Sequence, residues 1–417
     1  MHVTLRLSPS RLDEWQNRPR PCQRLYAAEG GRASCGDDVR RRVLTVVRWP
    51  LGGIRTYLLY NYPILARAGY RFTLVGPADA FFRGLCCDMQ SWEDVEFVEA
   101  PLSGTRCSLR STVRRLLGER QFGLIHSQGL IAAVDAVLAN LGYGVPHVIT
   151  SHDVVRPGQF SGLRGWLKRR ALGRILSRAH ALVAVSHDVR QNHLQYLPAL
   201  ERGPCRVATI LNGVDTARFG NHQPPPGPPL RKRLGVPEGA YLLGFLGRFM
   251  EQKGFLLLVD ALERLIAAGP SPRVHLVAVG SGDYVREYRG EIARRPAVAG
   301  CITLVDHTPD ITPILREIDL LVMPSLWEAC PLLPMEAMCA GTPVLGSDCI
   351  GLREVLFGSP SRMVPAGDAA ALAQAIGHAI AAPWKEKAAE YAPVACRRFD
   401  VRYGAGQLLA LFDQFVT

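Results

Sequence analysis

Two series of alternating strand-like and helix-like segments constrain this 417-residue chain more than any other feature. Short apolar runs rich in β-branched residues, such as residues 43–47 and 241–246, alternate with longer segments whose apolar residues recur at helical spacing, such as residues 54–68. Strands that alternate with helices are typical of a parallel sheet with helices on both faces. We therefore predict an α/β protein with two doubly wound, Rossmann-like domains facing a cleft, which is where open sheets of this kind bind ligands.

A proline-rich segment separates the two series. Residues 223–229 read QPPPGPP, and so many prolines are compatible with neither a helix nor a central strand. We predict an N-terminal domain over residues 43–222, a stiff linker over residues 223–229 and a C-terminal domain over residues 230–395. Residues 396–417 are expected to form a helix that packs back on the N-terminal domain, and the Arg-rich, aperiodic residues 1–42 to form a poorly ordered extension.

Composition narrows the class of protein. Hydrophobic residues make up 48% of the chain and charged residues 21%, which indicates a folded globular protein. We find no apolar run of the ~18–20 residues that span a bilayer and no apolar core of a secretory signal, so we expect a cytoplasmic protein. The eleven cysteines include no CxxC pair, which favours reduced thiols over disulfides or zinc.

The net charge of +12 is unevenly distributed. Residues 1–225 hold 30 Lys and Arg against 17 Asp and Glu, whereas residues 226–417 hold 19 against 20. A one-sided basic field favours an anionic partner, such as a phospholipid surface, a phosphorylated acceptor or nucleic acid. We recognise no nucleic-acid-binding motif, so no nucleic acid is expected as a partner. The alternative is a solvated, Arg-rich surface without a specific partner.

Two basic helical segments lie in this half, at residues 109–117 and 162–177. A helix with Trp and Leu on one side and Arg or Lys on the other can lie in the headgroup region of an anionic membrane. We therefore predict peripheral binding at the inner face of the membrane. The alternative is that Trp166 and the leucines face the domain core.

Glycines and cations follow the first strand of each series. Gly52 and Gly53 end the first strand and open a helix, where backbone can approach a ligand and free N–H groups can bind phosphate. In the second series, Gly247 and Arg248 follow the strand and Lys253 precedes the helix. A guanidinium and an ammonium at such a position suit a diphosphate. An ordinary turn with two solvated cations is the alternative.

Residues 323–343, MPSLWEACPLLPMEAMCAGTP, place two carboxylates in mostly apolar surroundings, where they need partners. Glu328 lies in a loop, and Glu336 lies in the first turn of a helix predicted to begin near Pro334, where the helix dipole favours a carboxylate. Such a pair can contact different hydroxyl-bearing groups of one ligand. Solvated glutamates, one of which caps the helix, are the alternative.

Taken in order, these segments resemble the retaining glycosyltransferases of the GT-B fold, family 4. The resemblance runs from about Val43 to Asp368. The motifs that carry it are Gly52-Gly53, Ser151-His152-Asp153, Asn212-Gly213-Val214-Asp215, Gly247-Arg248, Lys253-Gly254, Glu328, Glu336, Ala340-Gly341-Thr342-Pro343-Val344 and Gly367-Asp368. One departure is that Ala329-Cys330-Pro331 stands where Gly-Phe-Gly is commoner, which would alter the sugar pocket.

The resemblance implies a role for each matching position. Arg248 and Lys253 would hold the donor diphosphate and Glu336 the ribose hydroxyls. Glu328, together with the backbone N–H groups of Cys330 to Leu332, would hold the transferred sugar, and His152 would lie near that sugar. The implied catalytic residues are His152, Arg248, Lys253 and Glu328, and the implied donor-binding residues are Gly52, Gly53, Gly247, Cys330, Pro331, Leu332 and Glu336.

The function implied is transfer of a sugar from a UDP- or GDP-sugar to a saccharide or lipid-linked acceptor. It would proceed with retention and serve cell-surface polysaccharide, lipopolysaccharide or glycolipid synthesis. Because the chain contains no Asp-x-Asp, we expect no metal and no other cofactor, with cations and helix dipoles stabilising the leaving diphosphate instead. A nucleotide-sugar epimerase of similar build and a catalytically silent sugar-nucleotide-binding subunit are the alternatives.

Overall fold

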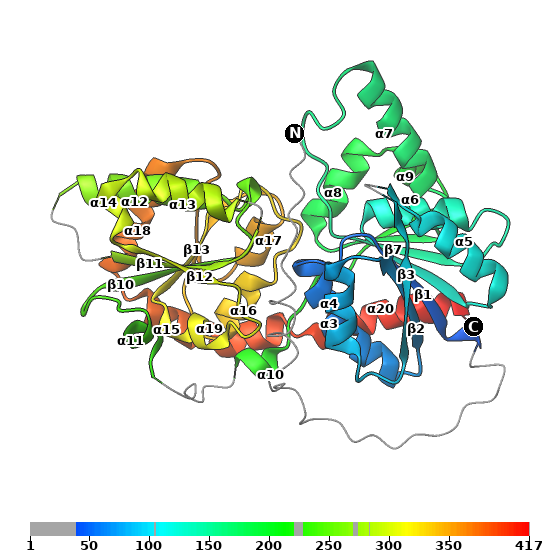
Figure 1. Ribbon diagram of the computed structural model, residues 1–417, viewed down its shortest axis with the longest axis horizontal. Helices are drawn as coiled ribbons and strands as arrows, with labels where there is room; N and C mark the ends of the chain where they lie inside the picture. The colour runs from blue at the N-terminus through cyan, green and yellow to red at the C-terminus, as the bar shows by residue number, and fades with distance from the viewer. Residues whose placement is uncertain (1–38, 104–105, 221–227, 270–273, 283, 417) are drawn as a thin grey trace. The chain divides into compact units, whose positions relative to one another are not determined.

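The computed structural model describes residues 39–103, 106–220, 228–269, 274–282 and 284–416 (Figure 1). Most of the expected extension at residues 1–42 and most of the proline-rich linker therefore lie outside the described residues. Of the extension, residues 39–42 are described, and Arg42 already begins the first strand.

The first sheet has seven strands in the order β3-β2-β1-β6-β7-β8-β9, and neighbouring strands are parallel throughout. The strands are β1 (Arg42–Val47), β2 (Arg71–Pro77), β3 (Val95–Ala100), β6 (Leu124–Gln128), β7 (His147–Ser151), β8 (Ala181–Ala184) and β9 (Arg206–Thr209). Its main helices are α3 (Gly53–Arg67), α4 (Ala80–Met89), α5 (Leu109–Glu119), α6 (Leu130–Ala139), α7 (Gly162–Leu176) and α8 (His187–Tyr196). We call this sheet with these helices the N-terminal half.

The second sheet has six parallel strands in the order β12-β11-β10-β13-β14-β15. These strands are β10 (Tyr241–Leu246), β11 (Val274–Gly280), β12 (Ile302–Asp306), β13 (Leu320–Met323), β14 (Val344–Asp348) and β15 (Arg362–Pro365). Its helices include α12 (Phe255–Ala267), α13 (Val285–Ala293), α15 (Thr312–Glu317), α16 (Leu333–Cys339), α17 (Leu352–Leu356), α18 (Ala369–Ile380) and α19 (Trp384–Arg398). We call this the C-terminal half. The two sheets confirm the predicted doubly wound α/β class.

Both faces of the first sheet are buried. Val43 and Val47 pack in one core with Tyr62, whereas Leu44 and Val46 on the opposite face of β1 pack in another. A strand covered on both faces has no polar side, which is why residues 43–47 of β1 are apolar except for the buried Thr45 and do not alternate with exposed polar residues.

The last helix, α20 (Val401–Val416), returns to the first sheet, where it packs on α3 and β6 (Figure 1, red beside blue). Leu408, Leu411 and Phe412 belong to the core under α3, and the Tyr70 hydroxyl donates to Asp413 Oδ1 at 2.8 Å. Residues 396–398, expected to start this helix, end α19 instead.

The two basic helices of the N-terminal half differ in which side they bury. Leu109, Leu116 and Leu117 of α5 are buried in the core, so the prediction that α5 offers an apolar side to a membrane is wrong. In α7, by contrast, Leu163 is 74% exposed and Trp166 41% exposed. Within the described ranges, no helix is long and apolar enough to cross a bilayer.

Candidate active site

The loops after the first strands of the two sheets lie next to each other. Gly52 is the N-cap of α3 with φ 52° and ψ −124°, a backbone conformation that only glycine adopts without strain. A Cβ atom on Gly52 would lie 3.8 Å from Nε of Arg248, which comes two residues after β10. Arg248 is exposed and has no ion-pair partner among the residues that the structure describes. A free guanidinium therefore lies beside the N-terminus of α3.

Lys253 and Glu328 form an ion pair in the C-terminal half. Lys253 Nζ donates to Glu328 Oε1 at 2.6 Å, and Ser325 Oγ donates to the same oxygen at 2.8 Å. The Glu328 side chain is almost fully buried, so the two donors supply the partners that its charge requires. The predicted phosphate cation and the predicted sugar carboxylate thus touch each other.

Glycine at position 254 makes this contact possible. Its φ is 67°, and a Cβ atom there would lie 2.0 Å from the carbonyl oxygen of Pro324. The short helix η1 (Glu251–Lys253) therefore lies directly against residues 324–332, which we call the β13–α16 loop. Two further bonds join them, because Leu326 N donates to Gln252 O and Gln252 Nε2 donates to Trp327 O, each at 2.8 Å.

Glu336 lies in the first turn of α16, as predicted, and is 6% exposed. Its Oε1 accepts a hydrogen bond from the Tyr60 hydroxyl of α3 at 3.0 Å. Burial raises the pKa of Glu336 to about 7, while the Tyr60 hydrogen bond and the positive charge of Arg218 oppose that rise. Arg218 is itself paired with Asp310 at 2.8 Å.

His152 follows β7 and contacts residues of the N-terminal half. Its Nε2 lies 2.9 Å from Gln128 Oε1, and its ring meets the Tyr57 ring edge-on at 4.8 Å between centroids. Burial lowers the pKa of His152 to about 3, so its imidazole is neutral at physiological pH. The side chain can then serve as a hydrogen-bonding group but not as a cation.

The structure brings predicted residues together in two pairs, Gly52 with Arg248 and Lys253 with Glu328, whereas Glu336 bonds to Tyr60 and His152 to Gln128, neither of which was predicted. One prediction needs correction, because Pro331 has no backbone N–H and cannot donate a hydrogen bond to a sugar. Cys330 and Leu332, both 7% exposed, keep their N–H groups.

Several residues at these positions were not predicted from the sequence. Tyr60 is one of many apolar or aromatic residues at helical spacing in α3, and Gln128 ends a buried strand, so neither stood out. One sequence signal could have pointed to Ser186 and Asp188. Residues 186–188 form a second Ser-His-Asp triplet after β8, and the first triplet, residues 151–153, begins at the last residue of β7.

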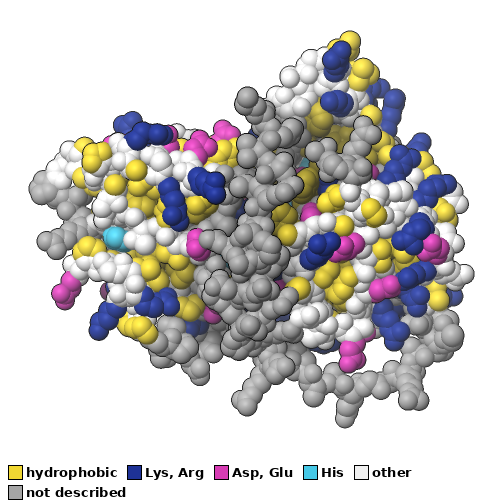
Figure 2. Space-filling model, viewed as in Figure 1, with side chains coloured by type: hydrophobic (Ala, Val, Ile, Leu, Met, Phe, Trp, Pro, Cys, Tyr) yellow, Lys and Arg dark blue, Asp and Glu magenta, His cyan; other side chains and the backbone are white. Residues whose placement is uncertain are grey.

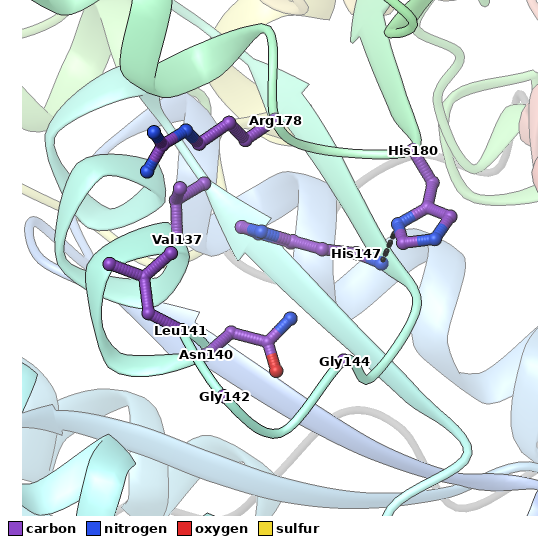
Figure 3. Close-up of a pocket in the computed structure, with 8 residues that line it drawn as sticks. All are labelled: Val137, Asn140, Leu141, Gly142, Gly144, His147, Arg178 and His180. Atoms are coloured by element: carbon purple, nitrogen blue, oxygen red, sulfur yellow. Dashed lines mark hydrogen bonds between the residues drawn. The ribbon is translucent and has the colours of Figure 1, made fainter.

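A separate hollow of about 240 Å³ lies at the opposite edge of the first sheet (Figure 3). His147 begins β7 and His180 precedes β8, and His147 N donates to His180 Nδ1 at 3.1 Å. Ligands of open parallel sheets bind at the carboxyl ends of strands, and this hollow lies at the amino ends. It is therefore not part of the candidate site.

Comparisons with known proteins decide the family. The model described as Glycosyltransferase Family 4 matches residues 51–218, and the model described as Glycosyl transferases group 1 matches residues 240–382. The chain is 30% identical over 290 residues to the alpha-maltose-1-phosphate synthase of Mycolicibacterium smegmatis, covering 64% of this chain and 72% of that protein. The chain belongs to glycosyltransferase family 4. This glycosyltransferase is also 28% identical over 340 residues to the phosphatidyl-myo-inositol mannosyltransferase of the same organism, with 78% and 80% coverage.

Solved structures show the same fold. HepE of Anabaena, crystallised with UDP-glucose, has a TM-score of 0.75 at 23% identity and covers 89% of this chain and 99% of its own. The sucrose-phosphate synthase of Thermosynechococcus elongatus has a TM-score of 0.71 at 20% identity, with 89% and 98% coverage. This family 4 glycosyltransferase therefore has the predicted GT-B fold.

Proposed function

We propose that this glycosyltransferase takes a hexose from a nucleoside-diphosphate sugar, with UDP-glucose as the first donor to test. The observation that carries the proposal is the exposed Arg248 guanidinium beside the free N–H groups at the start of α3. A cation and a helix N-terminus on facing loops form a site for phosphate oxygens. HepE, which has the same fold, was crystallised with UDP-glucose, which supports this choice of donor.

In the proposed mechanism, the protein stabilises charge that develops as the anomeric C–O bond breaks. Arg248, Lys253 and the α3 amides would bind the departing diphosphate, and preformed donors of this kind supply much of the rate enhancement of enzymes. Glu328 would hold a sugar hydroxyl while keeping Lys253 in place. His152, neutral, would accept or donate a hydrogen bond near the sugar. We further propose retention of configuration and no need for a metal ion.

The proposed acceptor is a saccharide or lipid-linked molecule at an anionic membrane surface, in synthesis of a cell-surface polysaccharide or glycolipid. Support comes from α7, where Leu163, Trp166 and Leu167 are exposed and no acidic residue is present. Basic and hydrophobic side chains meet at the top of Figure 2, where Figure 1 places α7. The cations of this helix are Arg164, Lys168, Arg169, Arg170 and Arg174.

Donor use can be tested by thermal shift and turnover with UDP-glucose, GDP-mannose and ADP-glucose. A bound donor raises the melting temperature by mass action, so the productive donor should do so in the wild type. With Arg248→Ala and Lys253→Ala combined, the shift should disappear and turnover should fall by roughly 100-fold. Near-normal turnover in a folded double variant would rule out the proposed diphosphate site. Product NMR tests retention, and EDTA tests the metal.

A further inference from the structure

Two side chains of the N-terminal half hold backbone carbonyls of the β13–α16 loop. Ser186 Oγ, two residues after β8, donates to the Ala329 carbonyl at 2.7 Å. Asn212 Nδ2, three residues after β9, donates to the Cys330 carbonyl at 3.0 Å. Ser186 is fully buried and Asn212 is 9% exposed. These consecutive carbonyls directly follow Glu328, the carboxylate that we propose for the sugar.

Because of the geometry of the peptide unit, a hydrogen bond to the Ala329 carbonyl also fixes the direction of the Cys330 N–H. A trans peptide unit is planar, and its N–H points opposite to its C=O. A bond from Ser186 to the Ala329 carbonyl therefore fixes the direction of the Cys330 N–H, away from Ser186. The next peptide has no N–H because residue 331 is proline, so Asn212 restrains the loop without orienting another donor.

A second set of contacts holds α8 against the C-terminal half beside the same loop. Asp188 accepts hydrogen bonds from Gly351 N and, through both carboxylate oxygens, from Arg353, all at 2.9 Å. In return, Glu354 accepts from His187 N and Asp188 N at 3.0 Å each, which places a carboxylate at the N-terminus of α8.

The turn at Gly351, which precedes Arg353 and Glu354, also touches the β13–α16 loop. Gly351 has φ 76°, and a Cβ atom there would lie 2.3 Å from the carbonyl oxygens of both Glu328 and Ala329. Ser186 and the turn at Gly351 therefore both adjoin the Ala329 carbonyl. We expect loss of the contacts between Asp188 and Arg353 to loosen both.

We propose that Ser186 and Asn212 are positioning residues for the transferred sugar, and that Asp188, Arg353 and Glu354 form a latch that keeps them on the β13–α16 loop. The inference rests on the proposed donor site and adds that this site is complete only when both halves contribute. Ser186 orients the Cys330 amide, and the amide contacts the sugar. Turnover then depends on residues that touch no substrate.

The main test compares Ser186→Ala with Ser186→Thr, using whichever of UDP-glucose, GDP-mannose and ADP-glucose supports turnover. Ser186→Ala should lower kcat about tenfold, the value of one hydrogen bond, with donor KM changed less than about threefold. Ser186→Thr keeps the hydroxyl and should restore kcat. A drop in Ser186→Ala that Thr does not restore would contradict the proposal.

Loss of helix capping needs its own control, because Ser186 Oγ also accepts from Val189 N as the N-cap of α8. Asp79 caps α4 by accepting from Phe81 N and Phe82 N, and among the described residues it makes no hydrogen bond to the β13–α16 loop. Asp79→Ala should therefore lower the melting temperature in the same way as Ser186→Ala but leave kcat unchanged. Equal kcat losses in the two variants would assign the effect to stability alone.

Hydrogen exchange and a latch variant separate the remaining outcomes. Residues 326–333 should exchange faster in Ser186→Ala and in Asn212→Ala than in the wild type or Asp79→Ala. Arg353→Ala changes a half-exposed side chain. It should also make residues 326–333 exchange faster, with a smaller loss of kcat than in Ser186→Ala. If these variants keep full kcat and protection while Glu328→Ala is inactive, the positioning role is wrong and the donor site stands. If Glu328→Ala is also active, the proposed donor site is itself wrong.

Discussion

The Tyr60 hydroxyl and the Glu336 carboxylate, which are 276 positions apart in the chain, form a hydrogen bond of 3.0 Å between α3 and α16. Glu336 is buried, and its pKa is raised to about 7. The hydrogen bond from Tyr60 acts in the opposite direction because it stabilises the ionised carboxylate. The protonation of this carboxyl group near neutral pH therefore depends on a residue of the other half.

The first prediction concerns Tyr60→Phe. Removing the hydroxyl should raise the pKa of Glu336 further, so that the carboxylate forms at higher pH. If the ionised Glu336 binds the ribose hydroxyls, the donor KM should fall as pH rises through about 7 in the wild type. In Tyr60→Phe the midpoint of this change should lie at higher pH. A KM profile that is the same in both proteins would contradict the link.

A second prediction concerns stability. Because the pKa of Glu336 in the folded protein lies above its ordinary value of 4.5, the folded protein binds more protons than the unfolded chain between pH 4.5 and about 7. By linkage, this group makes the protein less stable as pH rises through that window. Glu336→Gln cannot ionise and should remove this part of the decline. Melting temperatures of both proteins from pH 4.5 to 8 provide the check, and parallel curves would show that Glu336 does not titrate there.

The third prediction separates backbone approach from folding at Gly53. A Cβ atom on Gly53 would meet no other atom within 4 Å, so Gly53→Ala should fold normally and gain a little helix stability. It should nevertheless weaken donor binding by placing a methyl group where the diphosphate would lie. Gly290, in α13, is equally unobstructed, and Gly290→Ala serves as the matched control. Unchanged donor affinity in Gly53→Ala would place the phosphates elsewhere.

The Lys253–Glu328 pair leads to a fourth prediction. Lys253→Ala leaves a buried carboxylate with one donor, Ser325, and should lower both the melting temperature and turnover. Adding Glu328→Gln removes the unpaired charge, so the double variant should regain stability but not turnover. Recovery of turnover in the double variant would mean that Lys253 acts only as a partner for Glu328.

The fifth prediction tests membrane binding by α7. Each basic residue near an anionic surface contributes about 1 kcal/mol, so changing Lys168, Arg169 and Arg170 to Ser should release the protein from anionic vesicles. Binding should also weaken with salt. Changing Arg110, Arg114 and Arg115 of α5 to Ser removes the same charge from a helix whose leucines are buried. Equal losses in both triple variants would indicate general charge attraction, and no wild-type binding at low salt would exclude the membrane surface.

Local pattern was sufficient for the fold class. In long segments such as α3 and in buried runs such as β10, the spacing of apolar residues determines whether a helix or a strand forms. The bounds of both elements in the structure agree with the predicted bounds to within one or two residues. The edge strands β9 and β15 were not predicted because their sequences, RVAT and RMVP, are mostly not buried and form no apolar run, whereas the buried four-residue strands β8 and β13 read ALVA and LLVM. Helix α5 and helix α7 could not be distinguished, because apolar spacing does not reveal which side a neighbouring element covers.

The candidate site was predictable only in part, for a related reason. Strand ends, glycines and charged residues are local signals, and they identified Arg248, Lys253 and the two glutamates. The partners of these residues come from distant segments: Tyr60 reaches Glu336, and Ser186 reaches a carbonyl 143 positions away. Which residues form such pairs depends on how the two sheets are packed, and the sequence does not record this packing: the repeated Ser-His-Asp triplet marks Ser186 but not its partner.

The return of α20 to the first sheet has a consequence for synthesis on the ribosome. The strands of that sheet end with β9 at Thr209, but the helix that covers Tyr70 and completes the core begins at Val401, roughly 190 residues later. At about 5–20 residues per second, the nascent N-terminal half waits roughly 10–40 s with that surface uncovered. Until then its aromatic side chains are open to chaperones and to other nascent chains, and the emergence of residues 401–416 is the event that closes the first core.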